Sequence, residues 1–294
     1  MPLFNVEEQL IERLKTFSKK VKAVALYGSF ARGTQQSDSD LDLLLVSDEV
    51  NPRRHKRGKE IAAIKHLLAL DGPVDVLLLT TGECISNFKN HNPIFLDIAW
   101  EGIILVDSDD FLKSLIEETK KYIKERKLKK LKDGWVFAVP DRTPVMLSKV
   151  SNRDFAMAML TDGKRDFIIG IKILDDGYFD KAVYHFQQSV EKAVKAILIC
   201  FGIFKKTHFV GEILRQELEK RELNGDWKEK LIQVANTSSE VEPEVTWSRY
   251  PGIDKDVLWI PSEEYTVDDA LEIKEKSGEA LKIAEEFIQW WFRR

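Results

Sequence analysis

Cysteine is scarce in this chain of 294 residues, which holds only Cys84 and Cys200. The two lie far apart, and neither belongs to a Cys-x-x-Cys or Cys/His spacing. The sequence therefore predicts neither a zinc site nor a disulfide framework. We expect two reduced, buried thiols, as is usual for a cytoplasmic protein.

Long apolar runs and a strong excess of one charge are also missing. No window approaches the ~18 apolar residues that a membrane-spanning helix needs. The N-terminal stretch MPLFNVEEQLIERLKTF carries charges throughout, in place of the apolar region of a signal peptide. The net charge of −4 is small, so whole-chain electrostatics favour neither nucleic acid nor a membrane as partner. We expect a soluble, cytoplasmic protein without a membrane partner.

The first part of the chain alternates apolar runs typical of strands with amphipathic segments typical of helices. The predicted elements are a helix with Leu10, Leu14 and Phe17 on its apolar face, strands at 21–28, 41–46 and 73–80, and a helix with a short strand over 93–105. This order indicates a small sheet covered by helices.

The second part is helical in pattern. Residues 179–202 keep an apolar stripe for six turns and end at Gly202, and further helical patterns follow to the C-terminus. We therefore predict an α+β chain of three parts. They are a small mixed-sheet domain with helices at 1–115, a basic linker helix and connector at 116–149, and an all-helical bundle at 150–294.

Three carboxylates, Asp38, Asp40 and Asp42, are crowded at the start of the second predicted strand. Alternate strand residues share a face, so Asp40 and Asp42 point the same way while Leu41 points into the core. If the second and third strands are neighbours, Asp75 joins them, and the repulsion among the carboxylates requires cations. Oxygen ligands without His or Cys select Mg²⁺ or Mn²⁺. A pairing of Asp38 with Asp40 is the less favoured register, because DLDLLL puts Asp42 on the strand.

Gly28 ends the first predicted strand, and Ser29 follows it. A glycine lets the backbone approach a ligand closely, and Ser29 is a natural N-cap for a short helix whose N–H groups would bind phosphate. Cations opposite a phosphate cradle suit in-line displacement on a nucleotide. GSFARGT has the glycines of a P-loop but lacks its lysine, so we discard that interpretation. A plain Gly-Ser turn before a solvated acidic loop is the structural alternative.

The stretch GSFARGTQQSDSDLDLLL resembles the nucleotidyltransferase motif of the DNA polymerase β superfamily, and in particular the minimal nucleotidyltransferases. The resemblance implies that Asp40, Asp42 and Asp75 are catalytic metal ligands, and that Gly28 and Ser29 grip the phosphates. Arg32 is a further candidate for a triphosphate contact. The implied cofactor is Mg²⁺ (or Mn²⁺), and the implied substrate is an NTP, with ATP favoured. An inactive relative that retains the motif is the alternative.

The helical part resembles the HEPN domain over roughly residues 150–290. The resemblance rests on FDKAVYHFQQSVEKAVKAIL, on KKTHFV and on SRYPG. Many HEPN proteins are ribonucleases with an Arg that is separated by four to six residues from a following His. None of the five histidines here has an Arg four to seven positions upstream. Resemblance to aminoglycoside nucleotidyltransferases suggests instead that the bundle shapes the acceptor side, and a homodimer through the helical domain is a further partner that we consider.

Several other features carry two interpretations. His185 and His208 suit structural roles better than catalytic ones. Trp247, Tyr250 and Trp259 could line a pocket, but we favour aromatic packing. The basic segments 51–59 and 120–132 are either solvated surfaces or phosphate-tracking surfaces for RNA, and we place 51–59 near the carboxylates.

We therefore expect a Mg²⁺-dependent nucleotidyltransferase that moves an NMP from an NTP to an acceptor hydroxyl and releases pyrophosphate. The acceptor is a protein side chain, a small molecule or an RNA end. The first alternative is a catalytically weak nucleotide- or RNA-binding regulatory protein of toxin–antitoxin type. A HEPN ribonuclease ranks below both, because the Arg/His motif is missing.

Overall fold

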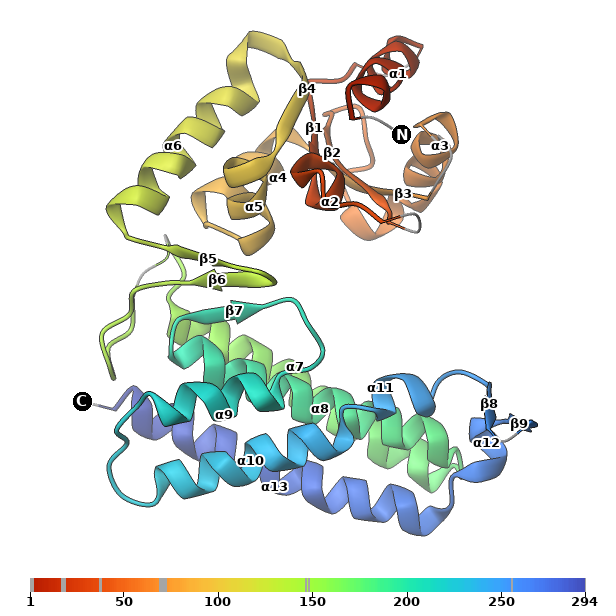
Figure 1. Ribbon diagram of the computed structural model, residues 1–294, viewed down its shortest axis with the longest axis vertical. Coiled ribbons are helices and arrows are strands. Elements are labelled where there is room, and N and C mark those ends of the chain that lie inside the picture. The colour runs from red at the N-terminus through yellow and green to blue at the C-terminus, as the bar shows by residue number, and fades with distance from the viewer. Residues whose placement is uncertain are drawn as a thin grey trace. The chain divides into compact units, whose positions relative to one another are not determined.

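The structure is a computed structural model whose chain divides into two compact units, unit 1 (Met1–Lys127) and unit 2 (Leu128–Arg294). The residues that it describes are 3–16, 20–36, 39–68, 73–145, 147, 149–254 and 256–293. Each unit is treated by itself (Figure 1). The described part of the chain contains no helix with the length and apolar character needed to cross a membrane.

Unit 1 is built around a four-stranded sheet with the order β3-β2-β1-β4. Its strands are β1 (Ala23–Tyr27), β2 (Leu41–Val46), β3 (Val74–Leu79) and β4 (Ile103–Asp107). β1 pairs with β2 and β4 antiparallel, whereas β2 and β3 are parallel. The predicted mixed sheet is confirmed, and so is the adjacency of the second and third strands.

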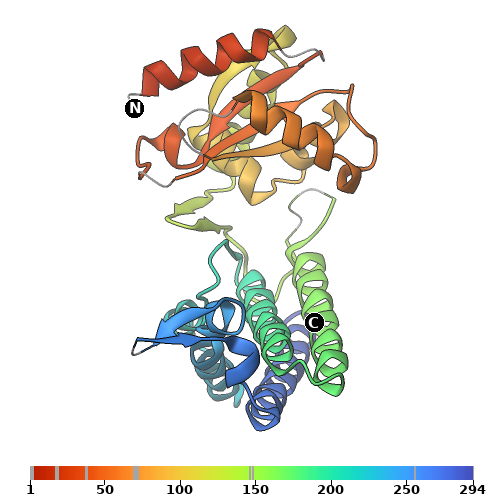
Figure 2. The same ribbon diagram turned by 90° about the vertical axis from the view of Figure 1, so that its right-hand side faces the viewer.

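Helices cover both faces of this sheet (Figures 1 and 2). They are α1 (Leu3–Lys15), α2 (Gly28–Arg32), α3 (Gly58–Leu68), α4 (Thr81–Lys89), α5 (Pro93–Glu101) and α6 (Phe111–Glu125), with short 3-10 turns at Arg54–Lys56 and Ser108–Asp110. Leu10 and Leu14 of α1 are buried as predicted, while Phe17 lies outside the described residues.

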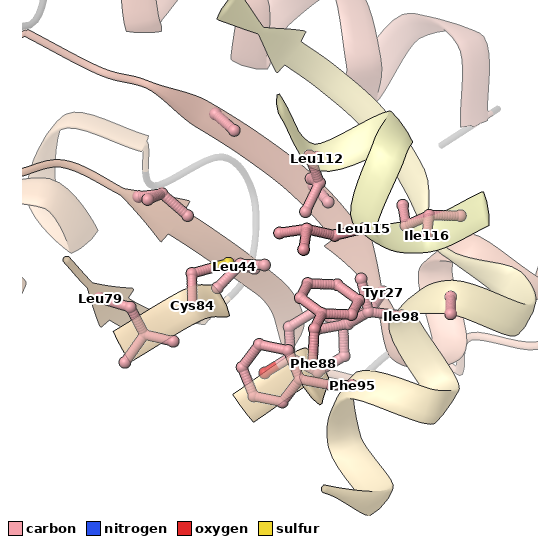
Figure 3. Packing of buried hydrophobic residues seen from close by; sticks show 14 residues of the cluster. Tyr27, Leu44, Leu79, Cys84, Phe88, Phe95, Ile98, Leu112, Leu115 and Ile116 are labelled. Carbon is pink, nitrogen blue, oxygen red and sulfur yellow. The ribbon is translucent and has the colours of Figure 1, made fainter. Parts of the chain in front are cut away.

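Strand alternation divides the core of unit 1 into two layers. Leu41, Leu43 and Leu45 of β2 pack with α1 and α3 on one face. Leu44 faces the other way, toward Phe88 and Phe95 of α4 and α5 (Figure 3). Val46 belongs to the same cluster. Tyr27 belongs to this second layer. Asp42, two residues before Leu44, therefore shares the face of Tyr27.

The expected linker helix is only partly helical. α6 ends at Glu125 and belongs to unit 1, and a β-hairpin of β5 (Lys129–Leu131) and β6 (Gly134–Val136) follows in unit 2. β6 also pairs with β7 (Ile203–Lys205). The basic residues of 120–132 are therefore divided between a helix and a hairpin in different units.

Unit 2 is mainly a helical bundle, as expected, with two small sheets in addition. Its helices are α7 (Asn152–Asp175), α8 (Phe179–Cys200), α9 (Gly211–Glu219), α10 (Trp227–Val241), α11 (Glu244–Trp247), α12 (Pro261–Glu264) and α13 (Val267–Trp291). A hairpin of β8 (Gly252–Asp254) and β9 (Val257–Trp259) lies between α11 and α12 in the chain. Helix α8 packs against α7, α10 and α13, which explains its broad apolar face.

Candidate active site

Two of the predicted carboxylates lie side by side at one end of the sheet. Asp42 of β2 is in register with Asp75 of β3, and on its other side Asp42 faces Tyr27 of β1. In-register residues on neighbouring strands share a face, and adjacent strands lie about 4.8 Å apart. Tyr27, Asp42 and Asp75 thus form a row across three strands.

Gly28 lies directly beneath the Asp42 carboxylate. Its φ is +75°, and a Cβ built on it would fall 2.0 Å from Asp42 Oδ2. Both observations exclude any larger residue, because a side chain at this φ is strained and this one would also overlap the carboxylate. The Gly28 backbone therefore sets the position of Asp42.

The prediction that Ser29 is a helix N-cap is wrong. The N-cap of α2 is Tyr27, in an extended conformation and without a side-chain cap bond. Ser29 instead lies in the first turn, where its carbonyl accepts a hydrogen bond from the Thr34 N–H at 3.0 Å. With Gly28 in a left-handed conformation, the helix begins two residues earlier than the sequence suggests.

Asp40 immediately precedes β2 and is exposed. No hydrogen bond or ion pair joins its side chain to another described residue. Within the described ranges, the structure contains no group of three or more His, Cys, Asp and Glu side chains arranged to hold a metal ion. The structure thus brings Asp42 and Asp75 together and leaves Asp40 beside them, outside such a group.

Two of the cations near this end already have partners. Arg32, the candidate triphosphate contact, forms an ion pair with Glu101 of α5. Lys65 of α3 lies 3.1 Å from Asp75 Oδ1, and Asp75 is 58% exposed in its side chain. The prediction for Arg32 stays untested, and Lys65 is a neighbour of Asp75 that sequence reasoning missed.

Tyr27 and Asp97 complete this environment and were also missed. Burial raises the pKa of the Tyr27 phenol, and the negative charges of Asp42, Asp75 and Asp97 raise it further. Tyr27 therefore stays protonated and neutral. Asp97 is only 4% exposed although it carries a carboxylate. The sequence did contain a signal that Asp97 is unusual, because it is the lone acidic residue in the apolar run IFLDIAW.

The basic loop 51–59 lies away from these carboxylates, contrary to expectation. It follows β2 beyond Val46, and Val46 itself lies about 13 Å from Asp42 by strand rise. Arg57 is fully buried there: it donates to the Leu78 carbonyl at 2.9 Å and binds both oxygens of Glu83 at 2.6 and 3.1 Å. Arg57 holds the loop to the ends of β3 and α4, while Arg54 and Lys56 are exposed.

The two histidines of the bundle have carboxylate partners, as their structural interpretation predicts. His185 Nδ1 lies 3.2 Å from Asp166 Oδ1, and His208 Nδ1 lies 3.0 Å from Glu191 Oε2. Arg249 instead lies over the rings of Tyr184 and Tyr250, at 4.9 and 4.8 Å from their centroids. No hydrogen bond between Arg249 and a histidine is found in the described part of unit 2.

The fold and the site together define a class of protein: a mixed-sheet domain with paired strand carboxylates, joined to a helical bundle. Comparison with known families gives the same division. The nucleotidyltransferase domain family matches residues 7–97, and the HEPN domain family matches residues 156–294. The chain belongs to both families and is a nucleotidyltransferase–HEPN protein.

Two curated relatives come from Methanocaldococcus jannaschii. A protein named "Putative toxin MJ1304" is 32% identical over 138 residues, which are 47% of this chain and 91% of that protein. A protein named "Putative protein adenylyltransferase MJ1305" is 28% identical over 126 residues, which are 42% of this chain and 86% of that protein. Each relative therefore matches less than half of this chain.

Solved structures show weaker likeness. A toxin–antitoxin crystal structure with AMP-PNP is 20% identical and covers 41% of this chain and 92% of that one, with a TM-score of 0.28. A nucleotidyltransferase-like protein from Exiguobacterium sibiricum is 11% identical and covers 97% of this chain and 74% of that one, with a TM-score of 0.36. At these scores the likeness supports no functional inference.

Proposed function

We propose that the chain transfers an NMP from an NTP, with ATP favoured, to an acceptor hydroxyl and releases pyrophosphate. The observation that carries the proposal is the row of side chains in which Asp42 and Asp75 lie in register, with the Gly28 backbone directly against Asp42. Neighbouring carboxylates at a strand end beside a glycine turn suit a metal-assisted reaction on a phosphate. The family of the domain supports the same chemistry.

The donor set fits a hard divalent cation such as Mg²⁺ or Mn²⁺. The candidate ligands Asp40, Asp42 and Asp75 offer carboxylate oxygens only. Mg²⁺ is commonly held by one or two protein carboxylates together with the phosphates of a substrate. An arrangement with no preassembled group of three acidic ligands in the described residues is compatible with that mode of binding. When bound, such a cation would neutralise the carboxylates and polarise the phosphate oxygens.

The chain's own residues have separate proposed roles. Asp40, Asp42 and Asp75 would hold the cations, and Asp75 would also accept the proton of the acceptor hydroxyl. Gly28 and Ser29 contact the phosphates, since a glycine without a side chain leaves the backbone N–H groups open. Arg32 would contribute a positive charge after leaving Glu101. Lys65 adds a positive charge beside Asp75, 3.1 Å from its Oδ1.

We infer that the acceptor is a protein hydroxyl, ahead of a small molecule or an RNA end. The support is the relative named as a protein adenylyltransferase, together with a second relative named as a toxin. This chain resembles both, so it would combine the two parts of a toxin–antitoxin pair in one polypeptide. In that case the HEPN domain of the same chain, or of a second copy, is the first acceptor to examine.

The test is incubation of the purified chain with each α-labelled NTP and Mg²⁺. We expect pyrophosphate release and label attached to protein, located afterwards by mass spectrometry. Added RNA and added small-molecule alcohols serve as competing acceptors. Label transferred only to RNA or only to a small molecule would contradict the protein acceptor while leaving nucleotide transfer intact.

Asp42→Asn is the decisive variant, and Asp110→Asn is its matched control. Both remove one carboxylate from unit 1, but Asp110 follows β4 at the opposite end of the sheet, since Asp107 pairs with Ala23 at the start of β1. We expect Asp42→Asn to abolish transfer and Asp110→Asn to retain it. Two results together would contradict this proposal: no turnover of any NTP by the unmodified chain, and nucleotide binding that survives Asp42→Asn. They would favour the alternative of a nucleotide-binding regulatory protein.

A further inference from the structure

Unit 2 contains a hollow surface that the proposed function does not use. It lies where α11, the β8–β9 hairpin, α12 and the start of α13 come together at one end of the bundle (Figures 1 and 2). Two lobes of about 450 and 290 Å³ share Trp247 and Trp259 as walls. We call this two-lobed hollow the tryptophan groove. Its combined size is that of small-molecule sites in proteins.

Two of the three aromatic residues are exposed, so our preference for aromatic packing is wrong for Trp247 and Tyr250. Trp259 is half-buried and packs edge-on against Tyr265. Trp247 is 57% and Tyr250 is 54% exposed, and Ile253 of the hairpin is also exposed. Large aromatic side chains gathered in a hollow on the surface are typical of binding sites, because their burial by a ligand is favourable. These residues, with Trp259, form the larger, apolar lobe.

The second lobe is acidic. Glu244, Glu264, Asp269 and Glu272 line it together with the two tryptophans. Within the described residues, neither lobe has a Lys, Arg or His in its lining. The groove therefore combines aromatic faces with a concentration of negative charge.

The four carboxylates differ in whether they have hydrogen-bond or ion-pair partners. Glu244 accepts a hydrogen bond from the Tyr265 hydroxyl, and Asp269 caps α13 by accepting from Thr266. Glu272 lies 2.7 Å from Lys276 Nζ. The Glu264 side chain has no hydrogen-bond or ion-pair partner among the described residues, and it is exposed. Glu264 is therefore the carboxylate most open to a ligand.

Aromatic faces attract cations through the negative charge above their rings, and carboxylates strengthen this attraction. Arg249 makes such a cation–π contact nearby, because its guanidinium lies over the ring of Tyr250. An anion such as a nucleotide phosphate would be repelled by the acidic lobe. The four carboxylates of the acidic lobe do not form a metal site, because the described residues contain no group of three or more His, Cys, Asp and Glu arranged to hold a metal ion.

We propose that the tryptophan groove binds a small organic cation of the alkylammonium class. The charged end lies against Glu264, between the faces of Trp247 and Trp259, and the carbon chain follows the apolar lobe toward Ile253. Charge complementarity selects a small organic cation over a neutral or anionic ligand of the same shape. This site is independent of nucleotide transfer in unit 1.

The test compares choline with its uncharged isostere, 3,3-dimethylbutan-1-ol, on the full chain. Binding is followed by the indole N–H signals of Trp247 and Trp259 in NMR, assigned with Trp→Phe variants. We expect choline to bind about tenfold more tightly, the scale of a cation–π interaction. Equal affinity for the two ligands, or no shift of either signal with choline or butylammonium at millimolar concentration, would overturn the proposal.

Glu264→Gln and Glu263→Gln form a matched pair in α12, because both residues are exposed but only Glu264 lines the groove. We expect Glu264→Gln to weaken choline binding about threefold, Trp259→Leu to weaken it more, and Glu263→Gln to leave it unchanged. Equal effects of the two Glu variants would contradict a role for Glu264. If Nα-acetyl-lysine amide binds while choline and butylammonium do not, the ligand is a protein side chain and the proposal of a small organic cation fails.

Discussion

Gly28→Ala is the sharpest probe of how the site is built. The substitution places a methyl group at a φ of +75° and 2.0 Å from Asp42 Oδ2. A left-handed conformation costs an L-residue about 1–2 kcal/mol. Overlap with the carboxylate adds about 1–3 kcal/mol, the usual range for overpacking. The expected destabilisation of unit 1 is therefore about 2–5 kcal/mol.

Gly33→Ala separates the two contributions. Gly33 ends α2 with a φ of +69°, but a Cβ on it would meet no atom within 4 Å. Its substitution carries the backbone cost alone, about 1–2 kcal/mol. In an Asp42→Ala background the carboxylate is gone, so the Gly28→Ala penalty should fall toward the Gly33→Ala value, with a coupling of about 1–3 kcal/mol.

Hydrogen exchange of peptides from β1 and β2 is the suitable assay. A chain of two units does not unfold in one step, whereas exchange reports the opening of unit 1 itself. Label transfer from NTP, measured in parallel, should fall more with Gly28→Ala than with Gly33→Ala, since only the first displaces Asp42. Equal destabilisation by the two glycine variants, or a Gly28→Ala penalty unchanged by Asp42→Ala, would refute the close contact.

Three further predictions concern buried groups. Arg57→Met removes the buried partner of the half-buried Glu83 and should destabilise unit 1 by about 3 kcal/mol. Substitution of the exposed Lys56 by Met should cost less than about 0.5 kcal/mol. Equal effects of the two variants in hydrogen exchange would contradict a stabilising ion pair between Arg57 and Glu83. Burial tends to raise the pKa of Glu83, but hydrogen bonds from Arg57 and Thr80 outweigh it and hold that pKa below 4.5. The ionised Glu83 thus stabilises unit 1 above pH 4.5. This contribution to stability is lost as the pH falls through the lowered pKa of Glu83. If the acid unfolding profiles of Arg57→Met and the unmodified chain were parallel, this contribution of Glu83 would be disproved. Burial raises the pKa of Cys84 to about 12 and also raises that of Cys200. Iodoacetamide should therefore alkylate neither thiol in the native protein at neutral pH, as measured by mass spectrometry. Alkylation of either cysteine would show that its thiol is accessible.

Much of unit 1 followed from local pattern. The apolar run LDLLLV became β2 at the predicted residues 41–46, because alternation and β-forming residues act over a few positions. The same alternation placed Leu41 in the core and Asp42 on the opposite face. The stripe at 179–202 likewise predicted α8, whose period of 3.6 residues is a property of one helix alone.

Other errors arose where one residue's role depends on a neighbour distant in sequence. Ser29 had the composition of a cap, but the left-handed Gly28, held against Asp42, shifted the helix start. The basic loop 51–59 is close in sequence to the acidic pair, yet six strand residues carry it to the other end of the sheet. Trp247 had the character of a core residue and lies exposed at a groove.

The sequence by itself determined the elements, the face that each side chain occupies and the chemistry of the Gly-Ser and Asp-x-Asp stretch. Only the tertiary structure decided which elements are neighbours. It placed Asp75 beside Asp42, brought Lys65 and Asp97 to the same end of the sheet, and assembled the tryptophan groove from segments between α11 and α13. The physical reason is range: periodicity is set by steric preferences within a few residues, whereas strand order and helix docking are set by the burial of apolar faces across the whole unit.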